Sequence, residues 1–454
     1  MPWQGECQFI LATAIQLVIP TGDPLKACNG EEMKSVGKAT IMAGIAACAL
    51  TAASVPDVLA GGFAVREQST ELQGMSFAGA AAGSTGLGSM YFNPATITQH
   101  DGFVSDSNLA FIIASSEAKG ATATTFGGVS LNGLGIGGSS ENIGSGILGD
   151  VAPVPASYYS YQWNEMIYLG LSLNSPYGLE TKSGAYVGGP HGYKSRITNI
   201  VATPTVGMKL SEKLSLAAGV QVSYLDGRLT TAFPGTQATL TEVEGDDFGV
   251  GFVAGLTFDL TEHTTVGVGF RSEIEHTLKG SFFTATIPTT TRMTADVTLP
   301  AQATVSVSHQ LNEQFKVAAS AEWTDWSTLQ SLIIQTTALG NIPQTFDWQD
   351  GWFFSLGGEY ASTDALTLRA GVAYELTPVT DLNRGPRVPD NDRVWVSVGG
   401  TYDWSDWIAL HGSYTHIFMK DGGVNLPATP LVPSLTANFE QSVDIASVGA
   451  TLKW

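Results

Sequence analysis

Cysteine and long hydrophobic runs are what this 454-residue sequence has least of. Its three cysteines, Cys7, Cys28 and Cys48, all precede residue 61. A chain that starts at Gly61 would therefore offer no thiol for a disulfide or a Cys-based metal site. No apolar run reaches the roughly 18 residues of a transmembrane helix. Basic residues are also scarce, and 21 Lys and Arg against 41 Asp and Glu give a net charge of -20. This balance, with no basic patch, argues against nucleic acid as a partner.

The feature that recurs is a pair of strands joined by a short polar turn. Each side of a turn is a run of about ten residues with alternating apolar character, the pattern of a transmembrane β-strand. Leu214, Leu216 and Val220 share one face, for example, whereas Ser215 and Gly219 share the other. The turns are predicted near Trp163-Asn164, Glu212-Lys213, Glu262-His263, Glu313-Gln314, Thr363-Asp364 and Ser405-Asp406.

One strand before these hairpins (103–115) and one after them (442–454) bring the total to about fourteen, an even number that allows a single chain to close. A water-soluble β-sandwich would show the same alternation with its apolar face inside. Turns of a few residues alternate here with connections of roughly 15 to 30, which is typical of outer-membrane proteins. The sequence therefore predicts an all-β fold, a fourteen-stranded antiparallel transmembrane β-barrel in the outer membrane of a Gram-negative bacterium.

Tryptophans near the predicted strand ends are expected to form aromatic girdles at the membrane boundary. They are Trp163, Trp323, Trp326, Trp348, Trp352, Trp404 and Trp407.

The N-terminus has the pattern of a secretory signal that begins at Met33. Lys34 and Lys38 precede an apolar stretch over 39–53, and small residues up to Ala60 offer a cleavage site. We expect residues 33–60 to be the signal peptide and residues 1–32 to be an upstream extension from a mis-assigned start. A competing interpretation is a lipoprotein signal with Cys48 as the lipidated residue.

Residues 61–100 carry the most specific pattern. They include Gly61-Gly62-Phe63-Ala64-Val65-Arg66-Glu67-Gln68-Ser69, then Leu72-Gln73-Gly74-Met75-Ser76-Phe77, then Tyr91-Phe92-Asn93-Pro94-Ala95. This segment resembles the N-terminal hatch of FadL-type outer-membrane transporters. Further stretches resemble the same family: Ser175-Pro176-Tyr177-Gly178-Leu179, Phe270-Arg271-Ser272-Glu273, Glu322-Trp323-Thr324-Asp325-Trp326-Ser327 and Pro389-Asp390-Asn391-Asp392-Arg393-Val394-Trp395.

The resemblance implies that residues 61–100 form a hatch inside a barrel of residues 101–454. It implies passive uptake of long-chain fatty acids, which outer loops capture and which leave laterally past the hatch at a kinked third strand. It assigns the hatch residues Phe63, Glu67, Gln68, Gly74, Asn93, Pro94 and Ala95, and the lateral-gate candidates Ser175, Pro176, Tyr177 and Gly178. Asn93-Pro94 could alternatively be a plain turn, and Pro176 and Gly178 could simply end a strand.

The ligand-binding candidates are Arg228, Phe282, Phe283 and Arg393, with Ile287 beside the two phenylalanines. An ordinary ion pair in the lumen is the alternative role for both arginines. Where fatty-acid transporters of the family can place a lysine after the Trp326-Ser327 stretch, this sequence has Leu332-Ile333-Ile334. A missing cation would favour uncharged ligands such as alkanes or aromatic hydrocarbons, because burying an unpaired carboxylate is costly. A general porin is a further alternative.

No enzyme activity, cofactor or metal is predicted. The seven histidines are scattered without metal spacing, and no Gly-x-Ser-x-Gly motif is present. The expected partners are a long-chain fatty acid or other hydrophobic small molecule and the lipid and lipopolysaccharide of the outer membrane, and the expected state is a monomer.

Overall fold

A computed structural model describes residues 62–136, 151–286 and 289–454. The predicted extension 1–32, the predicted signal 33–60, the lipidation candidate Cys48 and Ile287 lie outside these residues. Within the described ranges, no helix is long and apolar enough to span a bilayer.

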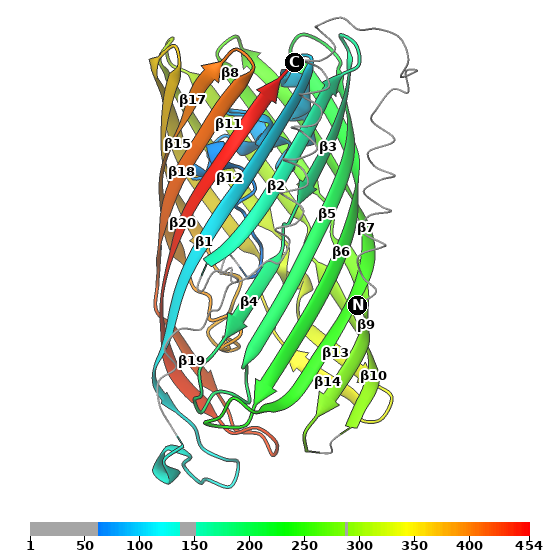
Figure 1. The fold of residues 1–454 in the computed structure, drawn as a ribbon, viewed down its shortest axis with the longest axis vertical. Helices are drawn as coiled ribbons and strands as arrows, with labels where there is room; N and C mark the ends of the chain where they lie inside the picture. Colours follow the sequence, from blue (N-terminus) through cyan, green and yellow to red (C-terminus); the bar gives the residue numbers. More distant parts are fainter. Residues whose placement is uncertain (1–61, 137–150, 287–288) are drawn as a thin grey trace, which may run out of the picture. The chain divides into compact units, whose positions relative to one another are not determined.

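The strands close into a fourteen-stranded antiparallel barrel, as the sequence predicts (Figure 1). β1 pairs with β2 on one side and with β20 on the other, so the first and last strands complete the ring. This closure removes the two open edges that a sheet would otherwise expose to lipid. The segments are β1 (Phe103–Thr122), β2 (Val151–Gln162), β3 (Ile167–Asn174), β4 (Gly178–Lys182), β5 (Lys194–Lys209), β6 (Leu214–Ala232), β7 (Thr239–Thr261), β8 (Thr264–Arg271), β9 (Ile274–Thr284), β10 (Thr289–Leu299), β11 (Gln302–Gln310), β12 (Phe315–Thr324), β13 (Ser331–Thr336), β14 (Gly340–Thr345), β15 (Gly351–Thr363), β16 (Leu366–Leu376), β17 (Arg393–Ser405), β18 (Ile408–Met419), β19 (Gly422–Leu426) and β20 (Leu435–Lys453).

There are more segments than barrel strands because some barrel strands are interrupted, giving the pairs β3/β4, β8/β9, β10/β11, β12/β13, β14/β15 and β18/β19. All the predicted short turns join consecutive strands at one end of the barrel, which we call the turn end. The connection 377–392 lies at the other end, the loop end, where β13, β14 and β19 also lie (Figure 1). Outer-membrane barrels carry their short turns on the periplasmic side.

The predicted alternation holds along the wall. Val220, Val250 and Phe252 are about half exposed or more, at 49%, 68% and 53%. The intervening Gly251 and Gly255 face inward, since a Cβ at Gly255 would lie 1.9 Å from the hatch residue Asn93. The apolar set therefore meets lipid and the small set lines the lumen.

Two of the predicted girdle tryptophans lie elsewhere. Trp163, Trp352, Trp404 and Trp407 are exposed on the barrel, but Trp326 and Trp348 are buried, at 2% and 4% exposure. Both belong to the segments that join β12 to β13 and β14 to β15, and these segments fold into the lumen. Proximity to a strand end does not distinguish an outward indole from one on an inward-folding connection.

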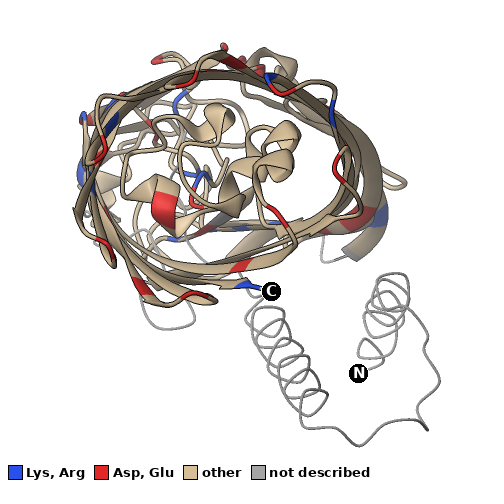
Figure 2. Cartoon of the chain, turned by 90° about the horizontal axis from the view of Figure 1, so that it is seen from above, with Lys and Arg blue, Asp and Glu red and all other residues tan. Residues whose placement is uncertain are grey.

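The hatch fills the lumen toward the turn end. It consists of α3 (Thr70–Gln73) and three 3-10 turns, η1 (Ala80–Ala82), η2 (Leu87–Tyr91) and η3 (Pro94–Gln99). Figure 2 shows these short helices inside the ring of strands. Two further 3-10 turns, η4 (Asn132–Leu134) and η5 (Trp326–Thr328), lie in connections of the barrel.

Candidate ligand cavity and hatch

An apolar cavity lies between the hatch and the loop end. It encloses about 90 Å³ of space that a water-sized sphere can occupy. Aliphatic and aromatic side chains form nearly all of its wall, and Ser195 and Arg387 bring polar side chains to it. The lining residues that the argument below uses are Phe63, Ser195, Leu229, Leu332, Trp348 and Arg387.

Phe63 of the hatch packs in an aromatic cluster at this cavity. Its ring centroid lies 4.7 Å from that of Trp326 and 6.0 Å from those of Tyr177 and Trp348. Gly62 precedes it with φ +68, and a Cβ there would come within 2.9 Å of both indoles. The hatch therefore enters the cluster through a position that only glycine fits without strain.

The same hatch segment is hydrogen-bonded to the predicted gate. Val65 N donates to Pro176 O over 2.8 Å, and Gly178 N donates to Phe63 O over 3.0 Å. Gln68 Nε2 adds a bond to Ser175 O at 3.0 Å. Phe63 to Val65 thus form a short antiparallel strand against residues 176–178, with Ala64 opposite Tyr177.

The wall is interrupted at this point. β3 ends at Asn174 and β4 begins at Gly178, with Pro176 between them. β2 pairs with β3 as far as Ser157 and Leu173, whereas the described partners of β4 are β5 and the hatch segment. The part of β2 over 151–156 therefore has no ladder partner on the β4 side among the described residues. The structure brings all four gate candidates together with the hatch at this break.

Ion pairs hold the rest of the hatch. Arg66 Nη1 lies 2.8 Å from Glu322 Oε1, and Glu71 Oε1 lies 3.2 Å from Arg369 Nη2. Arg369 also reaches Glu359 at 2.6 Å. These charges lie on the hatch and on inward positions of the wall, and they are taken out of water as pairs.

Glu67 is the exception among these charged groups. Its side chain is buried, and its Oε2 has no hydrogen-bond partner among the described residues. Burial raises the pKa of Glu67 to about 7, and a backbone hydrogen bond and the Arg66 charge offset only part of that effect.

The remaining hatch candidates have structural contacts. Gly74 lies against Gly399, where a Cβ would be 3.0 Å from its Cα. Asn93 caps η3, because its Oδ1 accepts from Ala95 N at 3.0 Å and Pro94 follows at the first helical position. Its Nδ2 also donates to Leu256 O of β7 at 2.8 Å. The amide of Asn93 thereby ties the hatch turn to the wall.

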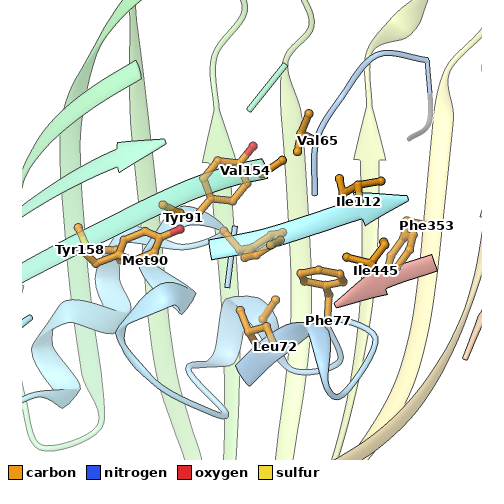
Figure 3. Close-up of a cluster of buried hydrophobic side chains, with 14 of the residues drawn as sticks. Val65, Leu72, Phe77, Met90, Tyr91, Ile112, Val154, Tyr158, Phe353 and Ile445 are labelled. Atoms are coloured by element: carbon orange, nitrogen blue, oxygen red, sulfur yellow. The ribbon is translucent and has the colours of Figure 1, made fainter. Parts of the chain in front are cut away.

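An apolar cluster completes the contact between hatch and barrel. Leu72, Phe77 and Met90 of the hatch pack with Ile112, Phe353 and Ile445 of the wall (Figure 3). These side chains exclude water between the hatch and the strands at the turn end.

The proposed ligand residues are not brought together. Gly227 and Leu229 line the cavity, so Arg228 between them points to the outer surface, where it pairs with Glu242 at 2.7 Å. The even-numbered residues Leu214 to Val222 already face outward, and continuing that alternation to Arg228 would have placed it. Arg393 is buried in a cluster with Asp390 and Glu375.

The two phenylalanines lie on opposite faces of β9. Phe282 is buried against Met293, Leu332 and Ile334, while Phe283 is partly exposed. They do not form one capture groove with each other. Arg387, which sequence reasoning missed, is the cation that lines the cavity. The signal in the sequence that could have found Arg387 is its position between Pro386 and Pro389, because prolines restrict the backbone of this loop.

Comparison with known proteins places this arrangement in a family. Residues 49–454 match the family model described as "Outer membrane protein transport protein (OMPP1/FadL/TodX)". The chain belongs to this family. Its members include outer-membrane transporters of hydrophobic compounds, and the family agrees with the barrel and with an outer-membrane location.

Two curated relatives illustrate its range. The chain is 26% identical to the "47 kDa outer membrane protein" of Pasteurella multocida over 328 residues, which cover 64% of this chain and 76% of the relative. It is 24% identical to the "Long-chain fatty acid transport protein" of Escherichia coli K12 over 389 residues, covering 75% and 84%.

Solved structures share the fold. A Pseudomonas aeruginosa FadL homologue superposes with a TM-score of 0.79 at 22% identity, covering 86% of this chain and 99% of that one. The Ralstonia pickettii toluene transporter TbuX superposes with a TM-score of 0.65 at 17% identity, covering 86% and 99%.

Proposed function

We propose that the protein is a passive channel for long-chain fatty acids, which bind in the apolar cavity and leave laterally through the wall at residues 175–178. One observation carries this proposal: the hatch segment 63–65 lines the cavity with Phe63 and is hydrogen-bonded to the interrupted strand at Pro176 and Gly178. A ligand that occupies the cavity therefore acts directly on the element that fills the break.

The energetics favour an apolar ligand as the trigger. Each buried methylene contributes about 0.8 kcal/mol, so several methylenes offset the loss of the Phe63 contacts. The link to residues 176–178 consists of a few backbone hydrogen bonds, each with a net contribution of about 1 kcal/mol. A chain that displaces Phe63 thus supplies enough free energy to release this segment, while the ion pairs of Arg66 and Glu71 keep the rest of the hatch docked.

A disulfide across the break tests the mechanism within one protein. Residues opposite each other in antiparallel pairs have Cα atoms about 4.5 to 5.5 Å apart, which suits a disulfide. Ala64→Cys with Tyr177→Cys would lock the hatch segment to the gate, in a described chain that has no other cysteine.

Uptake is measured as growth on oleate of a Gram-negative host that lacks its own outer-membrane fatty-acid channel. We expect the oxidised variant to bind oleate but fail to support uptake, and the reduced variant to recover uptake. Equal uptake in both redox states would show that the hatch segment need not leave residues 176–178, and would exclude this exit.

The size of the cavity favours a second candidate, an uncharged aromatic or other small hydrocarbon. About 90 Å³ is less than the roughly 150 Å³ of an engineered cavity that holds benzene, so the closed state cannot take a whole fatty-acid chain. Binding of oleate is therefore compared with binding of toluene and hexadecane to detergent-purified protein. Preference for the uncharged ligands would favour the second candidate, and binding of none of the three would contradict both.

We also propose a monomer in contact with outer-membrane lipid and lipopolysaccharide. The closed ring supports this, because its first and last strands pair with each other rather than with a second copy. Charged residues such as Arg196 and Arg228 cover the outer surface near the loop end, at 45% and 43% exposure, where the barrel would meet polar head groups.

A further inference from the structure

Arg387 is a partly buried cation that has no counter-ion among the described residues. No carboxylate of the described residues lies within 4.0 Å of its guanidinium, and its Nε has no hydrogen-bond partner there. Nη1 donates to Ser195 Oγ at 3.0 Å and to Lys194 O at 3.3 Å. Two other lumen arginines that contact the hatch, Arg66 and Arg369, have carboxylate partners. A third, Arg271, donates instead to Tyr91 O and Gln221 Oε1.

The surrounding loops pack against this arginine and leave it only partly exposed. Gly192 makes room for its stem, since a Cβ there would lie 2.8 Å from Arg387 Cγ. Its charge also acts on the hydroxyl of Tyr186, which is fully buried and has no hydrogen-bond partner among the described residues. Two buried donors therefore lack acceptors in the same part of the molecule, and buried polar groups are rarely left so.

The unpaired guanidinium of Arg387 is electrostatically unfavourable in this position. Burial lowers the pKa of Arg387 to about 10, and the group still carries its charge at neutral pH. A buried, charged and unpaired guanidinium is unfavourable unless an anion completes it. The adjoining cavity wall is otherwise apolar, so the anion that fits is one attached to a hydrocarbon.

We propose that Arg387, with Tyr186 beside it, binds the carboxylate of the ligand and selects amphiphilic carboxylates over uncharged hydrocarbons of the same length. This proposal rests on the channel function above and names the charge of its substrate. The hydrocarbon tail would lie in the apolar cavity toward Phe63 and Trp348, while the head group stays at the Ser195–Arg387 edge. Arg387 thereby supplies the cation that the Leu332-Ile333-Ile334 stretch does not.

The position of Arg387 also links head-group binding to the hatch. Three residues further along the same loop, Asp390 Oδ2 accepts a hydrogen bond from Gly62 N at 3.1 Å and from Thr377 Oγ1 at 2.7 Å. A shift of the loop toward a bound carboxylate would move the acceptor that holds Gly62, the residue before the hatch segment.

The test compares oleate with oleyl alcohol, which has the same chain without the carboxylate, on wild type, Arg387→Gln, Arg387→Lys and Tyr186→Phe. Charge-assisted hydrogen bonds to a buried carboxylate predict oleate binding about 10- to 100-fold weaker in Arg387→Gln, with oleyl alcohol unchanged. Arg387→Lys should recover part of the oleate affinity, and Tyr186→Phe should lose less than Arg387→Gln.

Arg228→Gln is the matched control, because it removes the same charge from the outer surface and should change neither ligand. The folded state of each variant is checked by the mobility of the unheated barrel in detergent gels. If Arg387→Gln does not fold, the wild-type preference for oleate over oleyl alcohol decides alone, and a preference below about threefold overturns the proposal.

The outcomes separate the two proposals. Similar binding of both ligands, unaffected by Arg387→Gln, would overturn the role of Arg387 while leaving a hydrophobic channel. Failure of wild type to bind either ligand would contradict the channel function itself. A loss of both ligands in folded Arg387→Gln would assign the residue a structural role instead.

Discussion

The two ends of the lumen are stabilised by different kinds of contact. Toward the loop end, Phe63 is held by aromatic rings and a few backbone hydrogen bonds around an apolar cavity. Toward the turn end, the hatch is held by paired buried charges and by glycines that let its backbone touch the wall. A hydrophobic ligand competes with the first kind of contact and cannot replace the second.

This difference explains how one segment of the hatch can move while the rest of the hatch stays bound in the barrel. Apolar contacts are non-directional and are readily exchanged for contacts with a ligand. When one partner of a buried ion pair moves away, the other is left as an unpaired buried charge, which is strongly destabilising. Ligand-driven movement should therefore be confined to the segment before Arg66, and the predictions below test that boundary.

Breaking a buried pair should have the largest effect. Glu322→Ala leaves Arg66 without its 2.8 Å partner and should weaken docking of the hatch by about 3 to 5 kcal/mol. A Ser89→Cys reporter measures this as the rate of thiol labelling, since Ser89 is fully buried and its hydroxyl has no partner among the described residues. We expect labelling at least about 100-fold faster. Replacing both Arg66 and Glu322 by Met should cost less, and equal labelling of Glu322→Ala and wild type would contradict the ionic anchor.

The protonation of Glu67 should make hatch docking depend on pH. Its pKa is raised from 4.5 to about 7 in the docked state, so docking is strongest below about pH 4.5. As the pH rises toward 7, a released hatch ionises first and docking weakens by on the order of 3 kcal/mol, with no further loss above that. Glu67→Gln should remove this dependence. The rate of thiol labelling at the Ser89→Cys reporter is compared between Glu67→Gln and its Glu67 parent at pH 5, 6 and 7.5. A difference between the two that does not change with pH would contradict the prediction.

Replacing a wall glycine by alanine should weaken hatch docking only where that glycine contacts the hatch. A Cβ at Gly371 of β16 would lie 2.2 Å from the backbone of Met75, whereas one at Gly412 of β18 meets nothing within 4 Å. Gly371→Ala should therefore weaken docking by about 1 to 3 kcal/mol. Gly412→Ala is the matched control and should label like the parent. Matching behaviour of the two variants would mean that the hatch is not in close contact with β16.

The smallest effect is expected from a substitution on the outer surface of the barrel. Removing the exposed Arg228–Glu242 pair by Arg228→Ala should change the free energy of barrel unfolding by less than about 1 kcal/mol, because solvent screens such pairs. Urea unfolding followed by tryptophan fluorescence measures it. A loss of more than about 2 kcal/mol would mean that the Arg228–Glu242 pair stabilises the barrel as strongly as the buried ion pairs of the lumen do.

Much of the barrel could be predicted from local sequence. Strand length, alternation and polar turns are local properties, and they located the six hairpins and the outward face of residues such as Val220 and Phe252. The hatch segment was found through resemblance of its motifs rather than from periodicity, because 3-10 turns rich in glycine have no regular pattern. The lengths of the first and last strands were underestimated, since β1 continues to Thr122 and β20 begins at Leu435. Past the lipid, the outward side chains become polar and the apolar signal fades.

The sequence by itself thus determined the barrel and its outward face, because both depend on neighbours along the chain. Only the tertiary structure decided which cation lies at the cavity, which tryptophans surround Phe63 and which glutamates hold the hatch. Those contacts join residues far apart in the chain, such as Gly62 and Asp390 or Arg66 and Glu322, through connections that fold back into the lumen. The path of such a connection depends on what it packs against, so no local pattern specifies it.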